Sequence, residues 1–166
     1  MYDFKPGPEA SPKERYDELC QAVEALTADE PDGVANMANT ASLLWEFLPD
    51  LNWAGFYRVS STKDGSGDEL VLGPFVGRPA CIRIPFGQGV CGSAAQQAKV
   101  HLVADVHAFP GHIACDAASR SELVVPVLRD EVVIAVIDLD SPTASRFDEA
   151  DAKGIEALAR ILAERI

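Results

Sequence analysis

Two apolar, β-rich runs are separated by only three residues, and this short link constrains the fold more than any other feature of the chain. The runs cover residues 122–128 and 132–139, and Arg129-Asp130-Glu131 joins them. Such a link fits an antiparallel hairpin and is too short for the crossover that parallel strands need. Residues 52–59 and 69–72 flank a polar turn and predict a second hairpin. We therefore predict an antiparallel sheet.

Helices are predicted before and after these hairpins. Ser11-Pro12-Lys13-Glu14 has the pattern of a capping box with proline in the first helical turn, so a helix should begin there. A second helix is expected over residues 33–47, and Asp148 should cap a last helix. Between the hairpins we expect a long connection over 73–92, a short helix over 92–98 and a strand over 100–103. The fold class is therefore α+β, with helices packed on a central antiparallel sheet.

Composition limits the domain organisation and the partners. The chain has 166 residues and 48% hydrophobic residues, so we expect one domain over 11–166, preceded by a flexible N-terminal arm over 1–10. No apolar run reaches the roughly 20 residues of a membrane span, and no secretory signal begins the chain, so a cytoplasmic location is expected. The net charge of −12 argues against nucleic acid and anionic membranes as partners.

Three of the four cysteines fall in a short stretch that contains many glycines and prolines. Cys81, Cys91 and Cys115 are each predicted to lie in a loop, where a thiolate can be accessible. Cys115 is the strongest candidate for a nucleophile because His112 is three residues away and an imidazole can favour the thiolate. Cys20 lies on the apolar stripe of the first helix and is interpreted as a core residue. A nucleophilic cysteine with a second cysteine in reach indicates thiol redox chemistry.

A metal site is a weaker interpretation of the same region. His107, His112 and Cys115 carry groups that bind metals, but their spacing is not that of a common zinc site and the chain has no CxxC pair. We therefore expect no bound metal or cofactor. A metal-dependent hydrolase would need bound zinc, which elemental analysis can test.

Acidic and aromatic residues near the strands suggest a binding pocket. Asp138 and Asp140 are two apart at the end of an apolar strand and share a face, and Glu122 opens another apolar run. Buried carboxyl groups can have raised pKa values and can act as acids or bind a cation. Trp53 and Tyr57 share one face of a predicted strand and can line a pocket. Each group also has a simpler explanation, solvated strand ends for the acids and core packing for the aromatics.

At the level of motifs the chain resembles the free methionine-(R)-sulfoxide reductases, which are single GAF-domain enzymes. The resemblance runs from about Tyr16 to the C-terminus. It rests on residues 73–77, Pro79-Ala80-Cys81-Ile82-Arg83-Ile84, Gly89-Val90-Cys91-Gly92, the segment 105–116 and Ser121-Glu122-Leu123-Val124-Val125-Pro126. A GAF-like fold and a homodimer are implied by this resemblance.

The resemblance also implies roles for individual residues. Cys115 matches the nucleophile and Cys81 the main resolving cysteine, while Cys91 matches a third cysteine that is near the substrate or resolves as an alternative. Glu122, Asp138 and Asp140 match acids of the substrate pocket, and Trp53 and Tyr57 match its aromatic residues.

These roles describe a thiol reduction of free methionine sulfoxide. Cys115 would attack the sulfur while Glu122 or Asp138, which we do not rank, protonates the oxygen. Cys81 would then form a disulfide, and thioredoxin, supplied with electrons from NADPH, would reduce it. The alternative function is a GAF module that senses a small ligand or redox state without catalysis.

Overall fold

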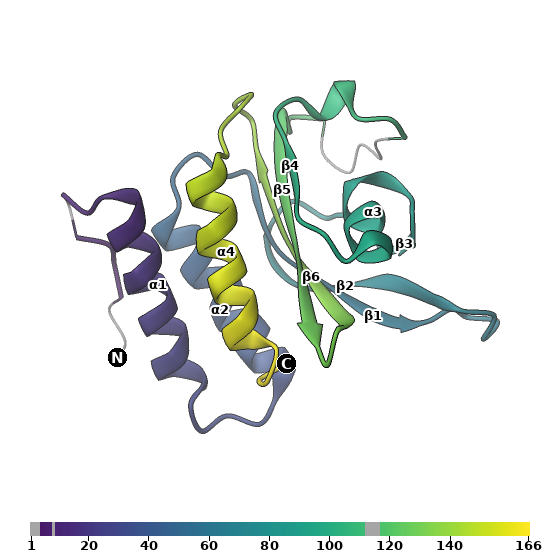
Figure 1. The fold of residues 1–166 in the computed structure, drawn as a ribbon, viewed down its shortest axis with the longest axis horizontal. Helices are drawn as coiled ribbons and strands as arrows, with labels where there is room; N and C mark the ends of the chain where they lie inside the picture. The colour runs from purple at the N-terminus through teal and green to yellow at the C-terminus, as the bar shows by residue number, and fades with distance from the viewer. Residues whose placement is uncertain (1–3, 8, 112–116) are drawn as a thin grey trace.

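The structure is a computed structural model that describes residues 4–7, 9–111 and 117–166. In this part of the chain, six strands form one sheet, with helices on both of its faces (Figure 1). The elements are, in chain order, α1 (Pro12–Thr27), α2 (Gly33–Phe47), β1 (Trp53–Ser61), β2 (Asp68–Gly77), β3 (Arg83–Pro85), α3 (Gly89–Gln97), β4 (His101–Val103), the 3₁₀ helix η1 (Val106–Ala108), β5 (Ser121–Arg129), β6 (Val132–Ser141) and α4 (Glu149–Leu162).

All strand pairs of the sheet are antiparallel, in the order β3-β2-β1-β6-β5-β4. The two predicted hairpins are β1–β2 and β5–β6. Asp130 and Glu131 form the β5–β6 turn with φ angles of 49° and 65°, the pair of positive values that a tight two-residue hairpin requires. The long connection through α3 and β4 lets β1 pair with β6 in the middle of the sheet. The predicted α+β class with an antiparallel sheet is confirmed.

The N-termini of the long helices follow the predicted capping patterns. Ser11 and Glu14 exchange side-chain and backbone hydrogen bonds in a capping box at the start of α1, and Asp148 does the same with Asp151 at the start of α4. None of the helices in the described part of the chain combines the length and the hydropathy of a membrane-spanning helix.

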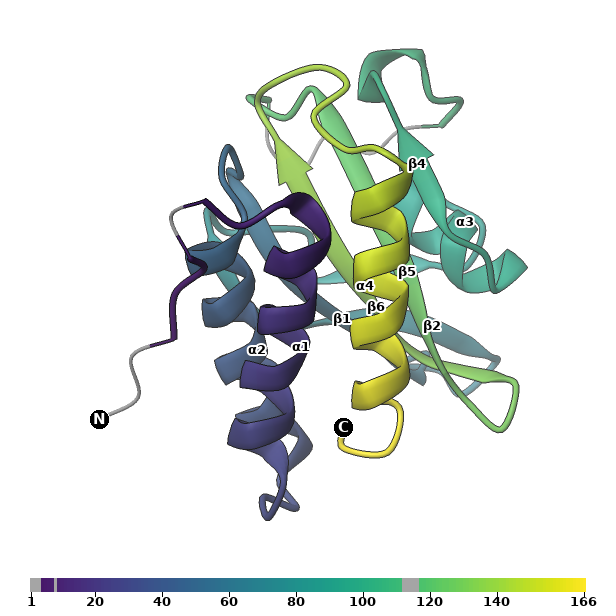
Figure 2. The same cartoon turned by 60° about the vertical axis from the view of Figure 1, so that its left-hand side comes forward.

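Three helices cover one face of the sheet, and α3 lies on the other (Figures 1 and 2). The larger core lies between α1, α2, α4 and the sheet, and it contains Phe56, Ile137 and Leu139. The smaller core lies between α3 and the opposite face, and it contains Trp53 and Tyr57. Because neighbouring residues of a strand point to opposite faces, each central strand contributes to both cores.

Two predicted loops are wrong. The connection expected over 73–92 is partly strand, because β2 continues to Gly77 and pairs with β1 through a register shift between Gly55 and Tyr57. Cys91 is not in a loop, because α3 begins at Gly89, three residues before the predicted start of the short helix. Gly89 and Gly92 suggested a turn in the sequence, but both belong to this helix.

Candidate active site

Three buried or half-buried acids meet on the α3 face of the sheet because of strand alternation and register. Asp138 and Asp140 of β6 point to the same face as Val136, which belongs to the smaller core. Glu122 of β5 is directly opposite Asp140 in the β5–β6 pair. All three acids line one pocket, so the predicted group of carboxyl side chains is brought together.

Aromatic side chains form one wall of this pocket. Trp53 is opposite Asp140 in the β1–β6 pair and stacks on Tyr57 with ring centroids 5.8 Å apart. Phe75 of β2 stacks on Trp53 at 5.2 Å, and the Trp53 indole Nε1 donates to the carbonyl oxygen of Arg78 at 3.1 Å. Two stacking contacts and one hydrogen bond therefore hold the indole, and Trp53 and Tyr57 both line the pocket.

The residue between these two aromatics has to be glycine. Gly55 is opposite Asp138 in the β1–β6 pair. A Cβ atom at Gly55 would lie 2.4 Å from Cβ of Phe75, far inside van der Waals contact. The absence of a side chain at this position lets Phe75 pack closely against β1 and behind Trp53.

The N-terminal end of α3 forms the opposite wall. Gln88, Gly89, Val90 and Cys91 line the pocket, and the N-cap residue Gln88 makes no side-chain capping hydrogen bond. The first turn of a helix carries backbone N–H groups without helical partners and a partial positive charge. The pocket therefore has an acidic sheet wall facing a helix end that favours anions.

Two of the acids are buried, and burial favours the neutral, protonated form of a carboxyl group. Glu122 and Asp138 are each only 6% exposed. Burial raises the pKa of Asp138 to about 7, although hydrogen bonding with Cys91 and Glu122 partly opposes the shift. Burial and the charges of Asp138 and Asp140 raise the pKa of Glu122 well above its ordinary range. Both groups can therefore carry a proton near neutral pH, as a general acid must.

Cys91 lies among these acids and is a poor nucleophile. Its side chain is 4% exposed, and its Sγ is 3.9 Å from Oε1 of Glu122. Burial, with the nearby charges of Asp138 and Glu122, raises the pKa of the Cys91 thiol well above its ordinary value. Because the thiolate is the reactive form, Cys91 is kept as a thiol that can donate a hydrogen bond.

The same three residues are the part of the pocket best suited to a cation. The sulfur of Cys91 and carboxyl oxygens of Glu122 and Asp138 lie within 4.8 Å of one another. Oδ1 of Asp138 is buried without a hydrogen-bond partner among the described residues. An ammonium group or a metal ion can be bound by such a set, and an ammonium group needs no deprotonation of the thiol.

The remaining predicted residues have different positions. Cys81 is half-buried next to Ala80 of the pocket wall and is disulfide-bonded. His107 lies in η1. Cys20 is a free, half-buried thiol on α1 that packs against the larger core, and burial raises its pKa to about 11. The predictions for Cys115 and His112 concern residues outside the described part of the chain.

Sequence reasoning missed several residues that line the pocket. Arg78 and Gln88 come from the segments before β3 and α3, and Ser119 comes from the segment before β5. Ser119 accepts a hydrogen bond from the side chain of Asn52 at 3.0 Å. These residues have no periodic pattern, and only the tertiary fold brings them to the site. Their neighbours Gly77, Pro79 and Gly89 are typical of loops, and a loop signal does not indicate where the side chains of Arg78 and Gln88 point.

Comparison with known proteins identifies the family. Residues 9–166 match the model of the GAF domain. The protein YtsP of Bacillus subtilis is 53% identical over 89% of this chain and 88% of its own length. The free methionine-R-sulfoxide reductase of Escherichia coli is 48% identical over 87% of this chain and 84% of its own. The crystal structure of free methionine-R-sulfoxide reductase from Neisseria meningitidis in complex with its substrate is 45% identical, with a TM-score of 0.91 over 99% of this chain and 95% of that one. The chain therefore belongs to the GAF-domain family of free methionine-R-sulfoxide reductases.

Proposed function

We propose that this protein reduces free L-methionine (R)-S-oxide to L-methionine with cysteine thiols as the electron donors. The observation that carries the proposal is the convergence of Glu122, Asp138 and Asp140 with Trp53 in one pocket. Two of these acids are buried and have raised pKa values. The names of the Escherichia coli and Neisseria meningitidis relatives support the same activity.

The two walls of the pocket suit the two charges of a free amino acid. The α-ammonium group would pair with the acids of the sheet wall, and the α-carboxylate would face Arg78 and the N-terminal end of α3. The S-methyl group would lie against the indole of Trp53. A methionine sulfoxide residue within a peptide has neither charge, so the pocket would select the free amino acid.

The first chemical step is the reduction of the sulfoxide. Glu122 or Asp138, in its protonated form, donates a hydrogen bond or a proton to the sulfoxide oxygen and makes the sulfur electrophilic. The Cys115 thiolate attacks that sulfur. The oxygen and the proton end on the cysteine as sulfenic acid, and methionine leaves with two more electrons than the sulfoxide had.

The second step resolves the sulfenic acid. The thiol of Cys81 condenses with it, which forms a disulfide and releases water. The disulfide-bonded state of Cys81 supports this role. The buried thiol of Cys91 is the weaker resolving candidate because its raised pKa leaves little thiolate. We assign Cys91 a place beside the substrate, as a hydrogen-bond donor to the acids.

Regeneration requires a dithiol from outside the chain. We propose a thioredoxin-type protein, itself reduced with NADPH, which would exchange its two thiols for the disulfide. The homodimer and the cytoplasmic location stay proposals that rest on the family resemblance and on the composition. Size-exclusion chromatography with light scattering tests the first, and fractionation of cells tests the second.

The deciding experiment follows NADPH consumption with thioredoxin and thioredoxin reductase, using each epimer of free methionine sulfoxide separately. We expect turnover with the R epimer only, and none for the Cys115→Ser variant. Cys81→Ser should release about one methionine per site and then turn over slowly.

Dithiothreitol provides the control for the reductant. Failure of both epimers with thioredoxin and also with dithiothreitol would reject the enzyme and favour a GAF module that only binds a ligand. Turnover with dithiothreitol alone would keep the reaction and reject thioredoxin as the reductant. Equal activity of wild type and Cys115→Ser would reject the assigned nucleophile.

A further inference from the structure

The two ends of the segment 104–120, which carries Cys115, each form a hydrogen bond with one short stretch of chain. This stretch, residues 141–146, follows β6 and precedes α4. At the first end, the backbone N–H of Ser145 donates to the carbonyl oxygen of Ala104 at 2.9 Å. At the second end, the N–H of Arg120 donates to the carbonyl oxygen of Ser141 at 2.7 Å. The residues between these ends include the proposed nucleophile.

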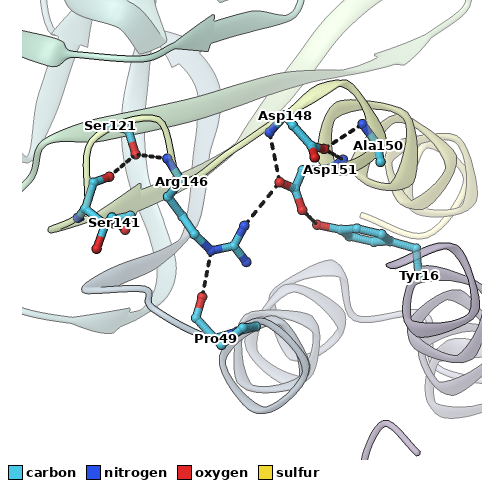
Figure 3. A network of polar contacts seen from close by, with 9 residues as sticks. Tyr16, Pro49, Ser121, Ser141, Arg146, Asp148, Ala150 and Asp151 are labelled. Atoms are coloured by element: carbon cyan, nitrogen blue, oxygen red, sulfur yellow. Dashed lines mark hydrogen bonds and ion pairs between the residues drawn. The ribbon is translucent and has the colours of Figure 1, made fainter. Parts of the chain in front are cut away.

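The hydroxyl group of Ser121 strengthens the second of these attachments. Ser121 is fully buried, and its Oγ donates to the carbonyl oxygen of Thr143 at 2.7 Å. Oγ of Ser121 also accepts a hydrogen bond from the backbone N–H of Arg146 at 3.3 Å (Figure 3). Because Ser121 is followed by Glu122, the attachment lies next to the pocket as well as at the end of the segment that carries Cys115.

The side chain of Arg146 connects this stretch to the helices of the opposite layer. Its Nε donates to the carbonyl oxygen of Pro49 at 3.0 Å, and its Nη1 forms an ion pair with Asp151 of α4 at 3.1 Å. The other carboxylate oxygen of Asp151 accepts a hydrogen bond from the hydroxyl group of Tyr16, on α1, at 2.6 Å (Figure 3). The arginine and the aspartate are both mostly buried, so this pair is little screened by solvent.

Tyr16 can reach Asp151 because α4 has glycine at the contact. A Cβ atom at Gly154 would lie 2.2 Å from Cγ of Tyr16, so any other residue would displace the ring. The hydrogen-bonded path therefore runs from Tyr16 through Asp151 and Arg146 to Ser121.

We propose that Arg146 is a positioning residue for the reductive step. It holds residues 141–146 against the helix layer, and those residues bond to both ends of the segment 104–120, which also bond to each other through the Val106 N–H and the Arg120 carbonyl oxygen at 2.9 Å. The inference rests on the proposed function, because it assigns Arg146 to the geometry of that same reaction. Attack on sulfur needs the reacting atoms in close alignment, and small displacements lower the rate strongly.

The test measures methionine release in a single turnover with the pre-reduced enzyme, together with KM under dithiothreitol. Arg146→Met removes the guanidinium, Arg146→Lys keeps the charge but not both bonds, and Ser121→Ala removes the hydroxyl. We expect Arg146→Met to lower the single-turnover rate by about tenfold to a hundredfold with little change in KM, and Arg146→Lys to recover part of it. The double variant that combines Arg146→Met with Ser121→Ala should show a smaller fold-loss of single-turnover rate than the product of the two single losses. Both substitutions act on one hydrogen-bonded path, so their effects should not be independent.

Arg165→Met is the matched control. Arg165 also binds helix groups, the carbonyl oxygen of Glu24 at 3.0 Å and Oγ1 of Thr27 at 2.6 Å, but it is at the other end of the fold. All rates are taken below the melting temperature and scaled to the folded fraction. Loss of rate in Arg146→Met but not in Arg165→Met supports positioning.

Two results would overturn the inference. Full rates per folded molecule in Arg146→Met would reduce Arg146 to a structural role. If that variant does not fold, a full rate in both Arg146→Lys and Ser121→Ala would do the same. A wild-type protein that releases no methionine would instead reject the proposed function.

Discussion

The two faces of the sheet are built from alternate residues of the same strands, yet they bury opposite kinds of side chain. On the face covered by α1, α2 and α4, strand β6 contributes Ile137 and Leu139 to a continuous apolar core. On the face covered by α3, the residues between and beyond them are Asp138 and Asp140, which line the pocket. One face stabilises the fold by removing apolar surface from water, and the other buries carboxyl groups at a cost.

Stability and function can therefore be separated one residue at a time along a single strand. Substitutions of apolar strand residues that face α1, α2 and α4 should change the free energy of unfolding and leave the chemistry of each folded molecule intact. Substitutions on the α3 side should change the chemistry and, where a buried acid is removed, increase stability.

The largest effect is expected on activity, from Glu122→Gln. The amide has nearly the shape of the carboxyl group but cannot transfer a proton or pair with an ammonium group, so kcat/KM for the R epimer should fall by about 10²- to 10⁴-fold. Steady-state kinetics with dithiothreitol measures it, with the melting temperature as the control. A value near that of wild type would remove Glu122 from the reaction.

On the face covered by α1, α2 and α4, we expect the largest loss of stability from Leu139→Ala. Leu139 is fully buried in the larger core, and such truncations cost about 2 to 5 kcal/mol of unfolding free energy. Urea unfolding gives the value, and kcat and KM per folded molecule should match wild type. Ile137→Val is the milder companion, at about 1 kcal/mol. A changed KM at full folding would show that the faces are not separable.

Asp138→Asn should stabilise the protein in a pH-dependent way. The folded pKa of Asp138 is about 7, against an ordinary value of 3.8. Between these values the folded wild type binds more protons than the unfolded chain, so its stability falls as pH rises through this window. The advantage of the variant should grow across it to about 1 to 2 kcal/mol. Melting curves from acid to neutral pH measure it, and a difference that shrinks over this range would contradict the environment described.

Cys91→Ser should have the smallest effect. The serine hydroxyl keeps a hydrogen-bond donor toward Glu122, and a thiol kept protonated contributes no nucleophile. Turnover should therefore stay within about fivefold of wild type, in contrast to Cys81→Ser. Loss of disulfide formation in Cys91→Ser, assayed by thiol titration after one turnover, would give Cys91 the resolving role instead.

The parts of the fold that sequence predicts are those in which local and tertiary preferences agree. The capping residues Ser11 and Asp148 lie where the helices begin, and the short link at Asp130 forms a tight turn. The predicted strand 69–72 is shorter than β2 because Gly73 and Pro74 are typical of turns, whereas pairing with β1 holds them in the sheet. Local propensity is outweighed there by tertiary contacts.

Strand alternation accounts for the shared faces of the candidate residues. A period of two placed Asp138 with Asp140 and Trp53 with Tyr57 on shared faces, and the structure has both pairs in the pocket. Arg78 and Gln88 lie outside regular strands, so no periodicity indicates where they point. Their place in the pocket depends on how β3 and α3 pack against the sheet, which no local pattern encodes.

The pKa of Asp138 makes ligand binding at this pocket an exchange of one cation for another. The raised pKa lets Asp138 carry a proton near neutral pH, and an ammonium group that pairs with its carboxylate must displace that proton. If Glu122 keeps its own proton, Asp138 exchanges a proton for the ammonium group while Glu122 can still donate its proton to the substrate. The heat of binding would then depend on the ionisation enthalpy of the buffer, and affinity would rise as the solution becomes more alkaline.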